Sequence, residues 1–498
     1  MISATIGQCA AKPPSEAQCR PSTRGPIKAI HASKGGLQQA CAPAGVSRVP
    51  QTRCRWAWWR ATAAPADLPD LDALLGDLSV PEIDADLASL QTEQGAVFDD
   101  DGVVVHYKND SRALHALEFA AAVADRSHWG RLRLAGEERL TFLHGQSTAD
   151  VKDLQPGSGC DTVFVTAQAR TIDLATVYAQ GSGALVVVSP GVKEALLQRF
   201  DKYIFPADKV SVQDISSKTC MFSLVGPQAD QVLQRLQAGA ICDAPYGSHT
   251  LLSFQGKPVI VAVGGGLPGP GYTFIADESV AADVWRVLTA QDGVEPMGSD
   301  VWQMARVMAG RPAPGSELTE DFNPLEAGLY HAVSVQKGCY IGQETISKVH
   351  NLSAVKQQLW GLEMAAPCVV GDQVQSAAPD GGVLGRVTSY IDTPDGRHRA
   401  LAYLKCKSRG AQVELEGVPV VVAGANGRVV APPFLSRAFP EGQGEPEAAA
   451  ASSEELAARK ADAQRQKEEE EAAAAAARAE KLRAMQERLA AWQAQQQE

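Results

Sequence analysis

Short strand-like runs alternate with helix-like stretches through the middle of the chain, and this alternation limits the folds that the chain can adopt. The apolar run 184–189 has the length of a strand, and the stretch that follows it repeats apolar side chains at helical spacing. The same order recurs in run 221–225 and helical stretch 229–236, and two more strand-like runs, 259–263 and 272–276, come later. Because strands and helices interleave at short spacing, we expect an α+β fold with antiparallel or mixed sheets.

The part of the chain from about 355 to 433 has another pattern. It contains four short β-type runs, at 358–362, 382–390, 400–404 and 418–423. Turn residues separate the runs, among them Pro394-Asp395-Gly396. This pattern predicts a small all-β domain with a barrel-like arrangement.

The length of 498 residues indicates two to four domains. We assign 61–105 to a linker or pre-domain and 106–350 to a core with two subdomains, about 106–220 and 221–350. The β-barrel domain is expected at 355–433.

The two ends differ in composition from this core. Residues 1–60 contain nine Lys or Arg residues but only one acidic residue, Glu16. A basic, acid-poor leader of this kind is typical of an organellar transit peptide, and a disordered basic arm is the alternative. Residues 441–498 are rich in Ala, Glu, Lys and Arg, which are strong helix formers, so we expect a solvated helix or a partly disordered tail there.

Composition excludes several classes of protein. A formal net charge of −12 argues against a general nucleic-acid-binding protein, which needs a concentrated basic surface. No apolar run approaches the roughly 20 residues of a membrane-spanning helix, so we expect no membrane insertion. The ten cysteines include no CxxC pair, which argues against a zinc site or a disulfide framework. We therefore expect no bound metal and free thiols in a reducing compartment.

The segment Lys337-Gly338-Cys339-Tyr340-Ile341-Gly342-Gln343-Glu344 carries the most chemical information. It places the thiol of Cys339 two residues from the ammonium group of Lys337, and a neighbouring cation favours the nucleophilic thiolate. Tyr340, Gln343 and Glu344 add hydrogen-bonding groups to the same loop. The alternative is that Cys339 is a small buried apolar residue.

This segment resembles the signature Lys-Gly-Cys-Tyr-x-Gly-Gln-Glu of the YgfZ family, whose members are related to the aminomethyltransferase of glycine cleavage. Other segments resemble the same family in the same order along the chain. They are Asp125–Arg131, Phe142–Thr148, Leu224–Pro227, Gly269–Tyr272, Arg306–Glu317 and Asn323–Leu329. The resemblance covers roughly residues 110–433.

The resemblance implies a ring-like, three-part fold that binds a tetrahydrofolate, and a role in the assembly or repair of iron–sulfur proteins. It implies that Cys339 and Lys337 are the key functional pair, supported by Tyr340, Gln343 and Glu344. Arg306 and Tyr272 are candidates for contacts with the pterin, which needs apolar walls and a few converging hydrogen bonds.

Two departures from the aminomethyltransferases bear on activity. Their pterin-binding segment contains a glutamate, whereas the matching stretch 267–272 has no acid. Their acidic pair is reduced here to one residue, Asp173, which is either a catalytic group or a structural hydrogen bonder. We therefore favour a folate-dependent factor for iron–sulfur proteins, with Cys339 as its functional thiol. An aminomethyltransferase-type transferase, and a scaffold that recruits partners through the tail, are the alternatives.

The sequence also suggests where such a protein acts and with what. The leader and the resemblance together predict a plant or algal member in the chloroplast stroma, with the mitochondrial matrix as the alternative. We expect a monomer whose partners are folate and iron–sulfur proteins or their assembly factors.

Overall fold

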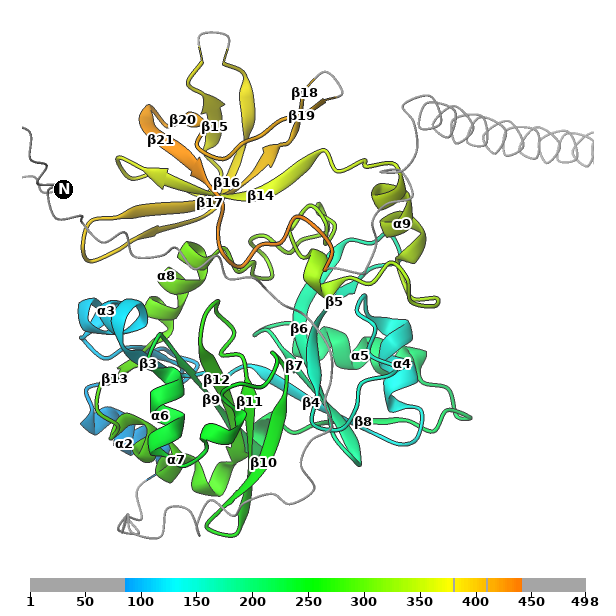
Figure 1. Ribbon diagram of the computed structural model, residues 1–498, viewed down its shortest axis with the longest axis vertical. Helices are drawn as coiled ribbons and strands as arrows, with labels where there is room; N and C mark the ends of the chain where they lie inside the picture. The colour runs from blue at the N-terminus through cyan, green and yellow to red at the C-terminus, as the bar shows by residue number, and fades with distance from the viewer. Residues whose placement is uncertain (1–85, 379–380, 409–410, 441–498) are drawn as a thin grey trace, which may run out of the picture. The chain divides into compact units, whose positions relative to one another are not determined.

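The computed structural model describes residues 86–378, 381–408 and 411–440 (Figure 1). The predicted transit peptide at 1–60 and the predicted tail at 441–498 lie outside these residues, as does most of the predicted linker. Among the described helices, none is long and apolar enough to cross a membrane.

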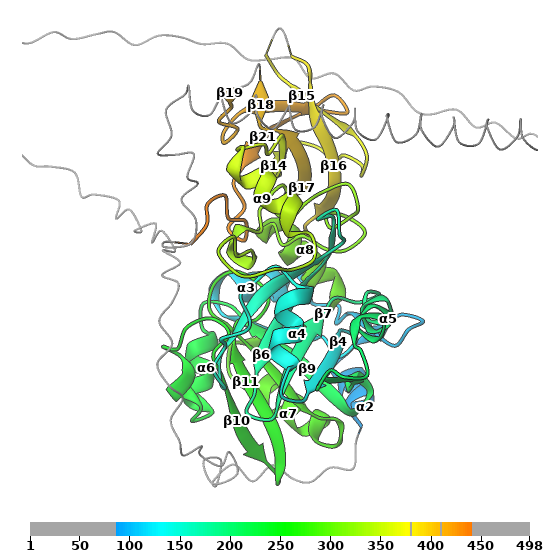
Figure 2. The ribbon, with the colours of Figure 1, turned by 90° about the vertical axis from the view of Figure 1, so that its right-hand side faces the viewer.

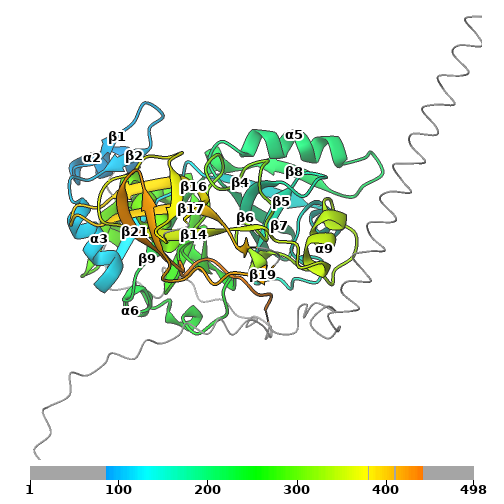
Figure 3. The same cartoon turned by 90° about the horizontal axis from the view of Figure 1, so that it is seen from above.

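The first sheet has five strands in the order β5-β6-β7-β4-β8, and every neighbouring pair is antiparallel. Its strands are β4 (Gly130–Ala135), β5 (Gly159–Val165), β6 (Thr171–Ala179), β7 (Gly183–Val188) and β8 (Ser211–Asp214). Helices α4 (Arg139–Gln146) and α5 (Lys193–Tyr203) pack on it, and Figure 3 shows α5 beside β4 and β8. Leu143, Leu196 and Phe200 bury the apolar faces of the two helices against the sheet.

The second sheet has six strands in the order β10-β11-β12-β9-β3-β13. Its strands are β3 (Ala121–Asp125), β9 (Thr219–Val225), β10 (His249–Phe254), β11 (Lys257–Val263), β12 (Gly271–Asp277) and β13 (Val294–Met297). The β13–β3 pair is parallel and the other pairs are antiparallel, so the sheet is mixed. The helices of this half are α2 (Leu87–Glu93), α3 (Asp110–Phe119), α6 (Ala229–Arg235) and α7 (Ala281–Thr289).

A short hairpin and three 3₁₀ turns complete the part of the molecule that contains the two sheets. The hairpin pairs β1 (Val97–Phe98) with β2 (Val104–His106), and the 3₁₀ turns are η1 (Ser216–Lys218), η2 (Gly239–Ile241) and η3 (Glu278–Val280). Side chains from both sheets form a shared apolar cluster that includes Trp129, Tyr178, Leu185, Met221 and Ile275. The two sheets therefore pack on each other through this cluster.

The third part is a closed β-barrel of six strands in the order β14-β17-β16-β15-β20-β21. The strands are β14 (Gln357–Met364), β15 (Gln373–Ser376), β16 (Val383–Asp392), β17 (His398–Lys405), β20 (Pro419–Val422) and β21 (Ala425–Val430). A short pair, β18 (Lys407–Ser408) and β19 (Ala411–Gln412), lies beside it. The α+β fold and the C-terminal barrel predicted from the sequence are thus confirmed.

The connecting region between the sheets and the barrel carries most of the predicted site. It contains α8 (Ser299–Ala309), η4 (Tyr330–Ala332) and α9 (Gln343–Asn351). Helix α8 contacts β16 and β17 of the barrel as well as α3 and β2. Figure 2 shows α8 between α3 and the barrel. The loop between η4 and α9 holds the cysteine segment.

Candidate functional site

Cys339 lies on the loop between η4 and α9, and its side chain is exposed. The other cysteines of the described residues (Cys160, Cys220, Cys242, Cys368 and Cys406) are buried or half-buried. A thiol must be accessible to react with a partner molecule. Of the described cysteines, Cys339 is therefore the one best placed for chemistry.

Lys337 anchors this loop to helix α4. Its Nζ donates hydrogen bonds to the carbonyl oxygens of His144, Ser147 and Ala149 at 2.6, 2.7 and 2.7 Å, and it lies 4.6 Å from the ring centroid of Tyr340. The ammonium group thus occupies the C-terminal end of α4, where backbone carbonyls lack helical partners and where a cation is favourable. Burial lowers the pKa of Lys337 to about 7, whereas the charge of Asp150 raises it.

This geometry changes the role expected for Lys337. All three hydrogens of an ammonium group are used by the three carbonyls, so the group holds the loop in place. The hydrogen bonds found among the described residues include none between the side chains of Lys337 and Cys339. Lys337 therefore acts on Cys339 only through its charge.

Tyr340, Gln343 and Glu344 lie where the loop joins α9. Tyr340 is buried in the apolar cluster under the barrel, and burial raises the pKa of its hydroxyl. Gln343 begins α9 and accepts a hydrogen bond from the backbone N–H of Tyr340 at 3.3 Å, while Glu344 is exposed in the first turn of the helix. Gly342 has φ of +87°, and a Cβ there would lie 2.9 Å from the carbonyl oxygen of Thr166, so glycine is required.

A histidine borders the cysteine loop. The Nε2 of His144 lies 3.8 Å from the position that a Cβ on Gly338 would occupy, and its Nδ1 lies 3.2 Å from Oδ1 of Asp150. Burial and the neighbouring Lys337 lower the pKa of His144. Burial and Lys337 therefore favour the neutral form of the His144 imidazole beside the loop.

Arg306 and Tyr272, the two residues expected near a pterin, both have partners within the protein. The guanidinium group of Arg306 donates to Glu317 at 2.9 Å, to Ser389 at 2.9 Å and to Gln303 at 2.8 Å, and it joins α8 to the barrel. Tyr272 is buried in the core of the second sheet, and its hydroxyl donates to Oδ1 of Asp230 on α6 at 2.6 Å. Each of these two side chains thus has hydrogen-bonding partners within the protein, and the predicted contact with a pterin stays a prediction.

Asp173 is fully buried on β6, away from the cysteine loop in the chain. Its Oδ2 accepts a hydrogen bond from the backbone N–H of Ser189 at 2.9 Å, whereas its Oδ1 is buried without a hydrogen-bond partner in the described part of the chain. Burial raises the pKa of this carboxyl group, and the charge of Arg311 opposes the rise. The five predicted loop residues thus lie within the segment 337–344, whereas Asp173, Arg306 and Tyr272 lie on β6, α8 and β12.

A polar cluster between the two sheets was not anticipated from the sequence. Asp161 on β5 accepts hydrogen bonds from the Tyr246 hydroxyl at 2.8 and 2.9 Å and from the Thr176 hydroxyl at 2.7 Å. Tyr178 lies close to this group and its pKa is raised to about 12, mainly by burial and also by the charge of Asp161. The cluster joins residues far apart in the chain, so no local pattern in the sequence could have indicated it.

Arg126 adds a cation to this region. Its guanidinium carbon lies 3.7 Å from the ring centroid of Trp129 and 4.5 Å from that of Trp302, a stacking geometry that stabilises a buried cation. The side chain donates to the Ser223 hydroxyl at 3.0 Å, whereas its Nε is buried with no acceptor among the described residues. The region therefore combines aromatic side chains with a buried polar group that still has unused hydrogen-bonding capacity.

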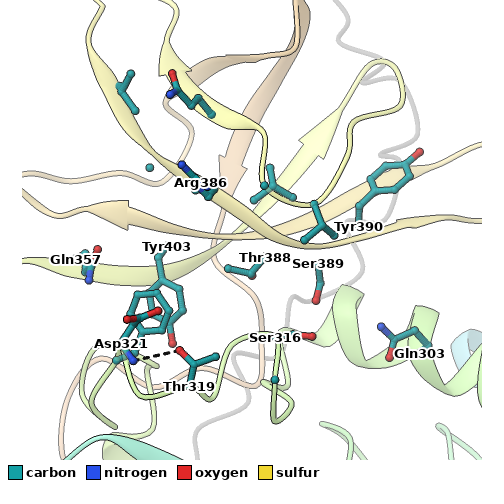
Figure 4. A pocket seen from close by; sticks show the side chains of 18 residues that line it. Gln303, Ser316, Thr319, Asp321, Gln357, Arg386, Thr388, Ser389, Tyr390 and Tyr403 are labelled. Atoms are coloured by element: carbon teal, nitrogen blue, oxygen red, sulfur yellow. Dashed lines mark hydrogen bonds between the residues drawn. The ribbon is translucent and has the colours of Figure 1, made fainter.

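A cavity of about 670 Å³ lies between the barrel and the loop 315–322 (Figure 4). Phe322 and Tyr403, stacked with ring centroids 3.4 Å apart, form part of its wall, and Arg386 and Asp321 contribute opposite charges. None of the eight site residues predicted from the sequence lines this cavity. Among the described residues there is also no group of three or more His, Cys, Asp or Glu side chains that could hold a metal.

Comparison with solved structures identifies a protein with the same fold. The chain superposes on the glycine cleavage system aminomethyltransferase T from Bartonella henselae with a TM-score of 0.60, covering 70% of this chain and 97% of that one at 20% identity. At this level of identity the similarity concerns the fold. The chain thus has the fold of an aminomethyltransferase T protein.

Sequence comparisons define the family. The family model described as "GCVT N-terminal domain" matches residues 86–337. The Arabidopsis thaliana protein named "Putative transferase At1g60990, chloroplastic" is 40% identical over 370 residues, which cover 74% of this chain and 84% of that protein. An aminomethyltransferase of Shouchella clausii is 29% identical over 343 residues, covering 67% of this chain and 91% of that protein. The chain therefore belongs to the GCVT family, as its resemblance to the relatives of aminomethyltransferase predicted.

Proposed function

We propose that the protein binds a tetrahydrofolate and supports the assembly or repair of iron–sulfur proteins, with Cys339 as its functional thiol. The observation that carries this proposal is the exposed Cys339 on a loop that Lys337 holds to α4 by three hydrogen bonds. An accessible thiol on a fixed loop can act as a nucleophile or as a soft ligand for a cluster that is being delivered.

The polar cluster between the two sheets suits a reduced folate. A pterin is flat and has polar edges, and Trp129, Trp302 and Tyr178 offer aromatic surface there. Buried groups with unused hydrogen-bonding capacity, the Nε of Arg126 and the Oδ1 of Asp173, can pair with the polar edge or the charged end of such a ligand. Membership of a family that includes aminomethyltransferases supports the same ligand.

His144 and Asp150 would support the thiol in this proposal. The Nδ1 of the His144 imidazole lies 3.2 Å from Oδ1 of Asp150, and its Nε2 lies near the residue that precedes Cys339. A neutral imidazole in this position can accept the thiol proton, which is the role usually given to histidine beside a nucleophilic cysteine. Lys337 would fix the loop, and Tyr340, Gln343 and Glu344 would form its base and the start of α9.

The name of the Arabidopsis relative includes "chloroplastic", and the basic leader at 1–60 agrees with that location. We therefore propose the plastid stroma as the site of action, with the mitochondrial matrix as the alternative.

Complementation tests the role of the thiol. The Cys339→Ala chain should fail to restore iron–sulfur enzyme activities in a strain that lacks its own family member, while it folds and binds tetrahydrofolate as the wild type does. Cys242→Ala, which changes a half-buried cysteine, is the matched control and should complement. Full complementation by the Cys339→Ala chain would remove the thiol from the proposal.

The second candidate is an aminomethyltransferase-type enzyme that transfers a one-carbon unit to tetrahydrofolate. The family membership and the buried Asp173 with one unpaired oxygen favour it. Formation of methylenetetrahydrofolate from a protein-bound aminomethyl group, lost in Asp173→Asn, would support it. Binding of tetrahydrofolate without turnover would exclude it.

A further inference from the structure

Four arginines of the described residues are almost fully buried, and they differ in their partners. Arg131 donates to the carbonyl oxygens of Ser127, Trp129, Ser216 and Thr219, and Arg306 pairs with Glu317 at 2.9 Å. Arg126 and Arg311 are 4% and 5% exposed, and neither forms an ion pair within the described part of the chain. Arg131 and Arg306 therefore have clear structural roles, whereas Arg126 and Arg311 do not.

Arg126 and Arg311 lie on the same indole. Their guanidinium carbons are 3.7 and 5.6 Å from the ring centroid of Trp129. Arg311 also lies 5.2 Å from the ring centroid of Phe434. Two buried guanidinium groups therefore share one aromatic surface.

The hydrogen-bonding capacity of both side chains is largely unused. Arg126 donates only to neutral oxygens, Ser223 Oγ at 3.0 Å and the Gly265 carbonyl at 3.3 Å, and its Nε has no acceptor. Arg311 contributes no side-chain hydrogen bond to those found among the described residues. Neither nearby acid forms an ion pair with these arginines: Asp161 accepts from Tyr246 and Thr176, and Asp173 accepts from the Ser189 N–H through Oδ2, while its Oδ1 has no hydrogen-bond partner among the described residues.

The backbone is shaped to hold the two arginines in this position. Gly310 ends α8 with φ of +81° and turns the chain so that Arg311 follows directly. A Cβ on Gly310 would lie 2.2 Å from Pro432, and one on Gly266 would lie 2.7 Å from Nη1 of Arg126. Gly266 thus leaves space for the guanidinium group of Arg126, and Gly310 allows the turn that precedes Arg311.

An unpaired buried charge destabilises a fold, and two like charges close together destabilise it further. Such an arrangement persists when a ligand of opposite charge provides the compensation, because binding sites commonly give up stability for function. Guanidinium groups pair with planar carboxylates through two parallel hydrogen bonds, and they stack on aromatic rings at the same time.

We infer that Arg126 and Arg311, stacked on Trp129, form a subsite for a carboxylate of the ligand bound between the two sheets. This inference rests on the proposed folate-binding function and specifies which side chains hold the negative end of a ligand. The carboxylate is either that of the glutamyl tail of tetrahydrofolate or that of a separate small amino acid that donates a one-carbon unit.

Calorimetric titration of the full-length chain with two folates tests the inference. Tetrahydropteroyl amide has the same pterin and aminobenzoyl groups as tetrahydrofolate but carries no carboxylate. The wild type should bind tetrahydrofolate at least about tenfold more tightly, because a subsite built for a charged group discriminates against a ligand without it. Arg126→Gln and Arg311→Gln should each remove most of this difference, and the exposed Arg235→Gln should retain it.

A different result is expected if the carboxylate belongs to a separate amino acid. If the two folates bind equally, sodium glutamate or glycine should still raise the melting temperature of the wild type and not that of Arg311→Gln. That result would support the subsite and assign it to a separate amino acid. If neither the folates nor the amino acids distinguish the wild type from Arg126→Gln and Arg311→Gln, the inference is wrong.

Stability of the unliganded protein gives an independent test. Arg311→Met should raise the melting temperature without ligand, since it removes an uncompensated buried charge. A lowered melting temperature together with unchanged ligand binding would show that Arg311 is structural. Failure of the inference differs from failure of the proposed function, because in the first case tetrahydrofolate still binds and in the second it does not bind at all.

Discussion

Replacement of Lys337 by Met tests whether this side chain anchors the cysteine loop. Methionine preserves the length of the side chain and removes the ammonium group. The carbonyl oxygens of His144, Ser147 and Ala149 then lose their donor, at least two of them in a buried environment. Each unsatisfied buried acceptor costs about 1–3 kcal/mol, so we expect a loss of about 3–5 kcal/mol in the free energy of unfolding.

Urea denaturation of the full-length chain, followed by tryptophan fluorescence, measures this loss. Lys348→Met is the matched control, because Lys348 is exposed on α9 and such substitutions usually change stability by less than about 0.5 kcal/mol. A loss below about 1 kcal/mol in Lys337→Met, similar to that in the control, would refute the anchoring role.

Three other buried or constrained residues give further predictions: Arg306, Gly342 and Asp173. Arg306→Met should lower the free energy of unfolding, measured by urea denaturation, by about 3–5 kcal/mol, because it leaves Glu317 as a buried unpaired charge. A loss as small as that caused by the exposed control Arg235→Met would contradict this. Gly342→Ala should lower the free energy of unfolding by about 1–2 kcal/mol, because Gly342 has a positive φ and lies close to the Thr166 carbonyl. Gly338→Ala should be nearly neutral, because a Cβ there would meet only His144 at 3.8 Å. Equal effects of the two substitutions would argue against the tight turn at Gly342. Burial raises the pKa of Asp173, so between pH 3.8 and the folded-state pKa the folded state binds more protons than the unfolded state. Stability relative to Asp173→Asn should therefore fall as the pH rises through this range, by at most about 1.4 kcal/mol per pH unit. A difference in unfolding free energy that does not change with pH would disagree with this sign.

The sequence predicted the elements of this fold better than the positions of their side chains. The strand-like runs 221–225 and 259–263 lie within β9 and β11, and the helical stretch 229–236 corresponds to α6. These elements have local periodicities that reflect burial on one or both faces. A small barrel-like domain was also predicted, because turn residues at short intervals separate several short strands there.

The side-chain roles required information that is not local. On β12, neighbouring residues point to opposite faces, so Tyr272 enters the core under α6 while Thr273 faces the Gly264 carbonyl in the other direction. The sequence could not assign these faces without knowing which helix covers the sheet. Arg306 was expected near a ligand, and its partners Glu317 and Ser389 come from a loop and from the barrel.

The polar cluster between the sheets depends on the same long-range pairing. Asp161 and Tyr246 are 85 residues apart, and only the packing of the two sheets brings them together. The cysteine loop was recognised because its residues are contiguous. Even so, the three carbonyl partners of Lys337 lie about 190 residues earlier in the chain, and no sequence pattern indicated them.

Titration of the full-length chain with tetrahydrofolate, in reducing buffer and without oxygen, is the most direct test of the central claim that the space between the two sheets holds a reduced folate. We predict saturable binding at one site that is unchanged in Cys339→Ala and weakened in Arg311→Gln. Absence of binding heat for a folded wild-type chain, under conditions in which an aminomethyltransferase of the family binds the same folate, would contradict the claim.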